Sequence, residues 1–188
     1  MDNPVEEARK SFYKFRIRDV VRSITEPYEA SVIASNVRKY FTTDATIEHP
    51  VLNQPASVNG RDDLEGIYKM LRVMTVNNKI DFHAVMFNED MTQGAIDLTE
   101  WINFRWNPFL SSTKLPARLL VRIDLKKCED GKYRIWRQQD NFPSDLTQSG
   151  QALLIPGLST LNTIVKTTVA IMTAKIGRVL LSRGWLGP

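Results

Sequence analysis

The chain has 188 residues, of which 43% are hydrophobic and 24% are charged, with nine glycines and nine prolines. This composition excludes collagen-like, low-complexity and wholly disordered proteins, and the length fits one domain of roughly 150 residues with an appended segment. The single cysteine, Cys128, excludes an internal disulfide, and one cysteine with two histidines excludes a Cys/His zinc cluster. No phosphate-binding loop, dinucleotide fingerprint or metal-ligand spacing is present, so we expect no metal and no cofactor.

The net positive charge is confined to the C-terminal end. All 21 acidic residues lie at or before Asp145, whereas four of the 25 basic residues follow it: Lys166, Lys175, Arg178 and Arg183. Residues 1–145 therefore balance 21 basic against 21 acidic groups, and the tail carries the whole excess of +4. Because this excess lies in a locally apolar segment and no nucleic-acid motif is present, it favours a lipid surface and argues against a nucleic-acid partner.

Three helices are predicted in the first half of the chain. Helical spacing of apolar residues favours helices over residues 4–24, 28–41 and 61–74, with a short extended piece at 45–50. The segment Met1–Glu7 is acidic and no apolar run follows it, so no secretory signal is predicted and we expect an intracellular protein with a free thiol.

From residue 79 the pattern changes to strands. Four segments are long enough for a sheet: Lys79–Asn88, Ala95–Trp106, Pro116–Lys127 and Lys132–Phe142. Glu129-Asp130-Gly131-Lys132 predicts a tight hairpin between the last two. The order predicts an α+β fold, with a curved antiparallel sheet of about four to six strands and three N-terminal helices on one face.

Three segments carry a family resemblance. Tyr40–Pro50 has an aromatic, Asp-Ala, apolar, Pro pattern; Val58–Leu64 is a glycine-led helix start; and Ile135–Asn141 is a closing strand that bears an acid. In this order they resemble the nuclear-transport-factor-2-like (NTF2-like) superfamily, whose SnoaL-like members form a cone of curved sheet closed by helices. The His49-Pro50 pair and the C-terminal extension resemble most closely its fungal SigF-like branch.

The resemblance implies where chemistry would occur. Enzymes of the superfamily, such as ketosteroid isomerases, scytalone dehydratase and polyketide cyclases, use an acid or a His–Asp pair inside the cone, where an apolar cavity raises the pKa of a carboxyl group. Asp140 matches the family's closing-strand acid, or else bonds the turn before Pro143. His49 is another catalytic candidate, or else a structural histidine bonded to the backbone.

Glu100 is a catalytic candidate on its own pattern. In residues 96–106 the apolar side chains fall on even numbers, and Glu100 shares their face. A carboxylate on an apolar face is either paired or functional, so Glu100 either serves a site, pairs with an arginine on a neighbouring strand, or is turned outward by a bulge.

A pocket for an apolar ligand would be lined by aromatic and polar side chains of the predicted helices and sheet, although the same residue types also pack ordinary protein cores. Because apolar residues lie on both faces of the strand that contains His83, the sequence does not decide which face its side chain points to. The predicted pocket residues are Tyr40, Tyr68, Phe82, His83, Phe104, Trp106 and Trp136.

The tail predicts an amphipathic helix. We divide the chain into a cone domain over residues 1–145, a linker over 146–157 and a basic helix over 158–188. Lys166 and Lys175 leave only eight uncharged positions between them, which disfavours a transmembrane span. The helix either lies on a membrane or packs on protein. The predicted membrane-contacting residues are Leu161, Val165, Lys166, Val169, Met172, Lys175, Ile176, Arg178, Val179, Arg183 and Trp185.

These patterns support three hypotheses. The first is a non-catalytic domain that binds an apolar small molecule or lipid in a cone-shaped cavity and attaches to a membrane or lipid droplet through its C-terminal helix. The second is a small isomerase, dehydratase or cyclase that uses an acid in the cavity. The third is a scaffold that forms a homodimer through its sheet.

Overall fold

The computed structural model describes residues 16–105, 114–144 and 157–183. The chain divides into two compact units, Met1–Pro143, here called the sheet unit, and Ser144–Pro188. Most of the first predicted helix, the pocket candidate Trp106 and the membrane candidate Trp185 lie outside the described residues.

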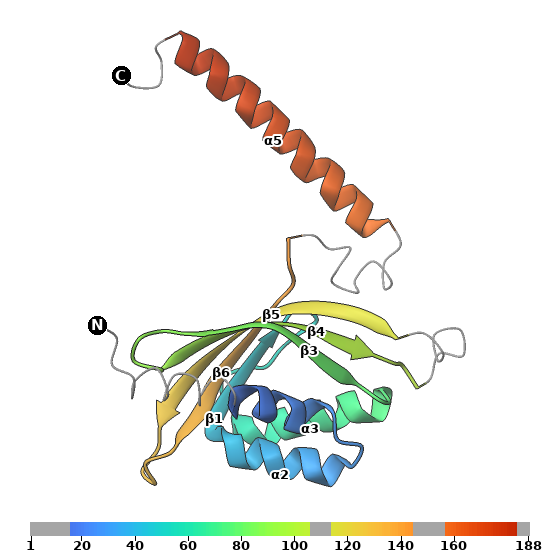
Figure 1. Cartoon of the computed structure of the whole chain (residues 1–188), viewed down its shortest axis with the longest axis vertical. Helices are drawn as coiled ribbons and strands as arrows, with labels where there is room; N and C mark the ends of the chain where they lie inside the picture. Colours follow the sequence, from blue (N-terminus) through green and yellow to red (C-terminus); the bar gives the residue numbers. More distant parts are fainter. Residues whose placement is uncertain (1–15, 106–113, 145–156, 184–188) are drawn as a thin grey trace. The chain divides into compact units, whose positions relative to one another are not determined.

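A six-stranded sheet forms the frame of the sheet unit, in the order β2-β1-β6-β5-β4-β3 (Figure 1). Its strands are β1 (Phe41–His49), β2 (Leu52–Asn53), β3 (Lys79–Phe87), β4 (Gln93–Ile102), β5 (Leu115–Lys127) and β6 (Tyr133–Asn141). All neighbours pair antiparallel except β1 and β6, which are parallel. The predicted α+β class is confirmed. The sheet is mixed rather than wholly antiparallel, because a long connection through a helix and four strands, not a hairpin, joins β1 to β6.

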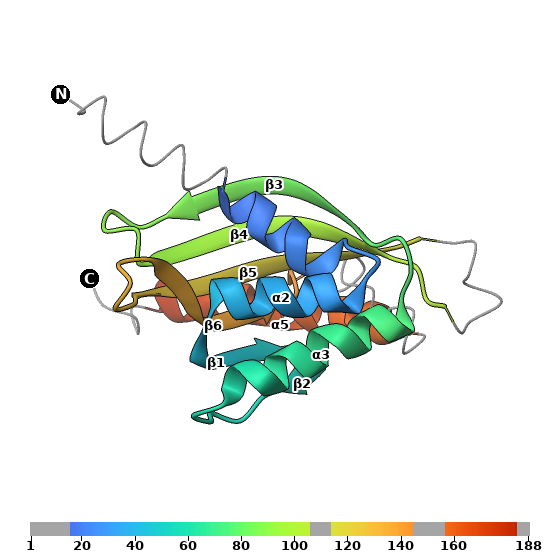
Figure 2. The same cartoon turned by 90° about the horizontal axis from the view of Figure 1, so that it is seen from below.

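Helices cover one face of this sheet (Figure 2). They are α2 (Ala30–Tyr40) and α3 (Gly60–Met74), together with helical residues 16–25. Helix α3 carries Asp62 and Asp63 in its first turn and Arg72 in its last, which suits the helix dipole. The predicted β5–β6 hairpin is present, and Gly131 adopts a φ of 74°, which glycine allows without strain.

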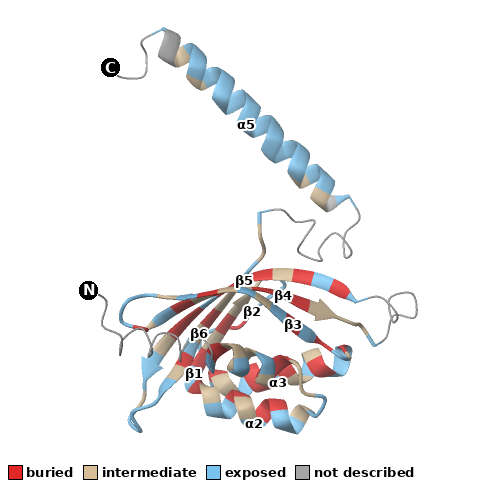
Figure 3. Cartoon of the chain, viewed as in Figure 1, coloured by how far each residue is buried: buried red, intermediate tan, exposed pale blue. Residues whose placement is uncertain are grey.

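The core lies where the helices meet the sheet, and the buried residues gather there in Figure 3. Phe41, Ile33, Leu64, Ile96 and Ile123 are among its fully buried side chains. The opposite face of the sheet carries polar pairs. Buried and less buried residues accordingly alternate along most of β5, with one face of the strand toward the core.

Helix α5 (Leu158–Ser182) is the described helix of the second unit, and it begins where the predicted basic helix over 158–188 begins. Most of its described apolar side chains are exposed, as Figure 3 shows. Ile164 and Ile171, which are not among the predicted membrane-contacting residues, are exposed as well. Within the residues that the structure describes, no helix has both the length and the apolar character needed to cross a bilayer.

Candidate functional site

Glu100 lies on the buried face of β4, level with Ile80 on β3 and Ala117 on β5. The residue is 9% exposed, and its Oε1 atom has no hydrogen-bond partner among the residues that the structure describes. Burial, and then the charge of Asp140, raise the pKa of the Glu100 carboxyl to about 7. Glu100 is therefore not turned outward, and among the described residues no arginine forms an ion pair with it.

Asp140 faces the same side of the sheet from β6, where it is level with Val121 of β5. The side-chain amide of Gln138 donates to both of its carboxylate oxygens, with Nε2 3.0 Å from Oδ1 and 3.1 Å from Oδ2. Burial raises the pKa of Asp140 to about 7, although the hydrogen bond from Gln138 opposes this rise. Both acids therefore exchange protons near neutrality.

Tyr68 connects α3 to this pair of acids. Its buried hydroxyl donates to Oε1 of Gln138 at 3.1 Å, and its ring lies 6.4 Å from that of Phe41. Burial raises the pKa of Tyr68, as does the charge of Asp140, so the hydroxyl stays protonated. A chain of hydrogen bonds thus runs from Tyr68 through Gln138 to Asp140. Sequence reasoning missed Gln138 as a site residue, and its alternation with Asp140 was the available signal.

A double irregularity decides which β6 side chains face this site. On β5 the register passes from Asp124↔Arg137 to Leu125↔Ile135, which leaves Trp136 without an opposite residue. The β1–β6 register also breaks at this point. Such bulges re-aim side chains, so Ile135 and Gln138 are buried whereas Trp136 is exposed.

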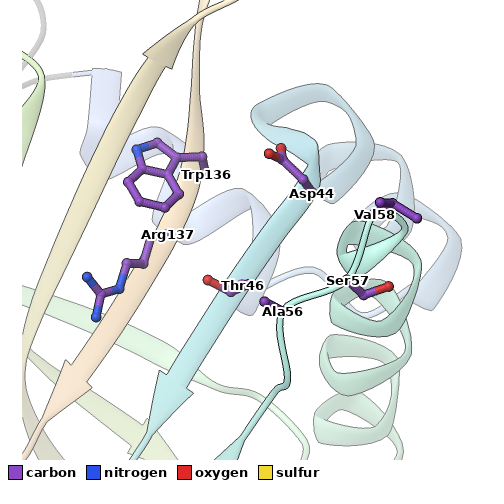
Figure 4. A pocket seen from close by; sticks show the side chains of 7 residues that line it. All are labelled: Asp44, Thr46, Ala56, Ser57, Val58, Trp136 and Arg137. Carbon is purple, nitrogen blue, oxygen red and sulfur yellow. The ribbon is translucent and has the colours of Figure 1, made fainter.

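Trp136 consequently lines a different feature, an open hollow of about 490 Å³ between β6, β1 and the segment before α3 (Figure 4). Its lining residues are Asp44, Thr46, Ala56, Ser57, Val58, Trp136 and Arg137. A second open hollow lies at the β3–β4 turn. Neither hollow is lined by Glu100 or Asp140.

His49 ends β1. The parallel register pairs Ile47 with Gln138, so its continuation brings His49 level with Asp140. The His49 ring meets that of Phe142 edge-on at 6.4 Å, and its Nδ1 accepts a hydrogen bond from the backbone of Val51 at 3.3 Å. Burial lowers the pKa of His49, which favours a neutral ring.

The structure does not bring the remaining predicted pocket residues to the acids as a group. Phe82 is half-buried on the inner face, level with Leu98. Tyr40 is half-buried and covered by Lys39, whose Nζ lies 4.9 Å from the ring centre.

Two more pocket candidates lie elsewhere. His83 is exposed, at a bulge in β3, with its Nε2 2.8 Å from Oγ1 of Thr99. Phe104 is half-buried and forms an isolated bridge with Thr75. Among the described residues, no three His, Cys, Asp or Glu side chains gather to hold a metal ion.

The class of protein follows from the curved sheet with helices on one face and acids on its inner side. Comparison with known protein families and solved structures names this class. The family model of the SigF NTF2-like domain matches residues 1–185, so the chain belongs to that family. The predicted resemblance is confirmed at this level, while the fungal branch stays a prediction. Among curated protein sequences, none matches the chain.

Solved structures show the same fold. An NTF2-like protein from Anabaena variabilis has a TM-score of 0.53 at 14% identity, over 79% of this chain and 98% of its own. A putative SnoaL-like isomerase from Agrobacterium tumefaciens has a TM-score of 0.51 at 8% identity, over 69% and 97%. A putative aromatic ring hydroxylase from Novosphingobium aromaticivorans has a TM-score of 0.50 at 11% identity, over 75% and 92%. At these identities the likeness shows the fold alone.

Proposed function

We propose that the sheet unit binds an apolar small molecule or lipid at the Glu100–Asp140 pair, and that α5 attaches the chain to a membrane or lipid-droplet surface. One observation carries the binding site: Oε1 of Glu100 is buried on an otherwise apolar face, and no described residue forms a hydrogen bond with it. Leaving such a group unsatisfied costs about 1 to 3 kcal/mol, which a ligand recovers when it supplies the missing partner. The site is ordered in advance by the hydrogen bonds from Tyr68 to Gln138 and from Gln138 to Asp140.

A second candidate function is proton-transfer catalysis of the isomerase, dehydratase or cyclase kind. The observation that favours it is the pKa of about 7 for both Glu100 and Asp140. A group with such a pKa accepts and donates protons with similar ease at neutral pH, which general acid–base catalysis requires. Glu100→Gln or Asp140→Asn would then abolish turnover of a bound compound, whereas a domain that only binds has no turnover to lose.

Native mass spectrometry of the purified full chain, followed by solvent extraction, tests the binding function. We expect an apolar passenger in the wild-type protein. Ala117→Leu, which adds bulk level with Glu100, should release it, whereas Ala95→Leu, on the other face of β4, should retain it. A folded wild-type protein that is empty and takes up no apolar compound would overturn the function. The same spectra give the oligomeric state and so test the predicted homodimer.

The membrane proposal is supported by the surface of α5. Leu161, Val165, Val169, Met172 and Ile176 are each about half exposed or more. The described tail carries basic residues and no acid, and each basic residue near an anionic leaflet contributes about 1 kcal/mol. This combination is typical of helices that lie in a membrane surface and detach reversibly.

Flotation with vesicles tests the attachment. The full chain should float with phosphatidylcholine vesicles that contain phosphatidylserine, and less with phosphatidylcholine alone. Val169→Gln with Ile176→Gln should abolish flotation, while the matched pair Thr160→Gln with Thr167→Gln, which has the same spacing on the opposite side of α5, should not. If the chain stays in the lower fraction with both vesicle types, α5 is not a membrane helix.

A further inference from the structure

The acid pair has more hydrogen-bond acceptors than donors. Two carboxylates offer four acceptor oxygens. The amide of Gln138 donates to Asp140, and the hydroxyl hydrogen of Tyr68 is already donated to Gln138. Among the described residues, none donates a hydrogen bond to Oε1 of Glu100. The group that completes this site must therefore bring donors of its own.

Within the described residues, the acid pair also has no positively charged partner. None of the ion pairs formed within the described ranges involves Glu100 or Asp140. Glu65 provides the contrast, since this equally buried acid is paired with both Arg38 and Lys69. The described part of the sheet unit thus neutralises a buried structural carboxylate elsewhere, but supplies no cation to these two.

Apolar groups flank Glu100 on both neighbouring strands and Asp140 on β5, while His49 continues the register beside Asp140 on β1. Ile80 and Ala117 flank Glu100, and Val121 flanks Asp140. A ligand in contact with both acids would place the rest of its body against these side chains. Such surroundings favour a small charged head on an apolar body, because burial strengthens the attraction between opposite charges.

We propose that the ligand of this site is an apolar amine, whose protonated ammonium group binds Glu100 and Asp140. This inference rests on the proposed binding function and specifies its ligand class. An ammonium brings both the missing N–H donors and the missing positive charge. A ketone or a carboxylate brings acceptors alone, and it would bind only after the acids of the site had taken up protons.

The assignment carries a pH dependence. An ammonium stabilises the ionised carboxylates, so amine affinity should rise as the pH rises through about 7, where Glu100 and Asp140 lose their protons. Among the described residues, the titratable or charged groups on this side include Tyr68 on α3, His49 on β1, Arg18 and Arg22 on the helix at residues 16–25, and Glu26, whose Oε1 accepts a hydrogen bond from the backbone of Ile80 at 2.9 Å. These arginines lie over the Phe82 ring, 5.7 and 5.2 Å from its centre.

Three compounds with the same apolar cage test the inference: 1-adamantylamine, 1-adamantanol and 1-adamantanecarboxylate, titrated calorimetrically into the full chain at pH 7.5. The amine should bind at least roughly tenfold more tightly than the alcohol, and the carboxylate most weakly. Glu100→Gln should remove most of this preference while the alcohol affinity changes little. Asp97→Asn, on the other face of β4 and paired with Arg118, should change neither.

The outcomes separate the two proposals. If the alcohol or the carboxylate binds as tightly as the amine, the amine assignment is wrong and the binding function stands. If none of the three binds, and the purified chain carries no apolar passenger, both proposals fall. Should Glu100→Gln not fold, the wild-type protein still decides the matter. Binding of the amine at pH 6 must then release protons from the acids into the buffer. The calorimetric heat of binding should therefore change with the ionisation enthalpy of the buffer. A heat of binding that is the same in every buffer would overturn the assignment.

Discussion

Replacing Glu100 by glutamine should stabilise the protein at alkaline pH. In the unfolded chain this carboxyl has a pKa near 4.5, and in the folded chain a pKa of about 7. Folding therefore takes up a proton between these values, and stability falls as the pH rises through that window. The difference between the two pKa values lowers the free energy of unfolding by about 3 kcal/mol at pH 8. Glutamine has nearly the same shape and carries no charge, so it avoids this cost.

Urea unfolding at pH 5 and pH 8, followed by near-ultraviolet circular dichroism, measures the effect. Glu100→Gln should raise the free energy of unfolding by about 3 kcal/mol at pH 8 and leave it nearly unchanged at pH 5. Glu65→Gln is the matched control. Arg38 and Lys69 lower the pKa of Glu65, so its stabilisation is present above the unfolded pKa and is lost as the pH falls below it. This control should lose up to about 1 kcal/mol at pH 8 and less at acidic pH.

The reasoning has a clear point of failure. If Glu100→Gln destabilises the protein by a similar amount at both pH values, the carboxylate has a partner that satisfies it in the fold. The acceptor count at the site would then be wrong, and with it the basis for the proposed ligand.

Two further predictions concern packing and the hydrogen-bond chain. Gly60→Ala should lower the free energy of unfolding in urea by more than about 2 kcal/mol, because the new Cβ would overlap the backbone oxygen of Ala45. Gly66→Ala should gain about 0.5 to 1 kcal/mol by the same measurement, since this α3 position has open space around it. Tyr68→Phe should cost about 1 kcal/mol, because it removes the hydroxyl that donates to Gln138. An unchanged stability of Tyr68→Phe would show that water replaces this donor.

Local sequence patterns predicted most helices and strands of the sheet unit. The expected helix over 61–74 corresponds to α3 (Gly60–Met74), and the expected strand Pro116–Lys127 to β5 (Leu115–Lys127). The even-numbered apolar positions around Glu100 predicted its face, and the residue is buried there with Leu98. These features were readable because helix and strand periods act over a few neighbouring residues.

Long-range pairing decided the arrangement of the candidate site. Alternation alone places Trp136 with Gln138 and Asp140, but irregular pairing with both β1 and β5 turns Trp136 to the other side. The parallel contact of β1 with β6, and the hydrogen bond from Tyr68 to Gln138 across 70 residues, follow from the same packing. A bulge arises from hydrogen bonds between distant strands, and a local periodicity carries no information about which distant partner a residue will meet.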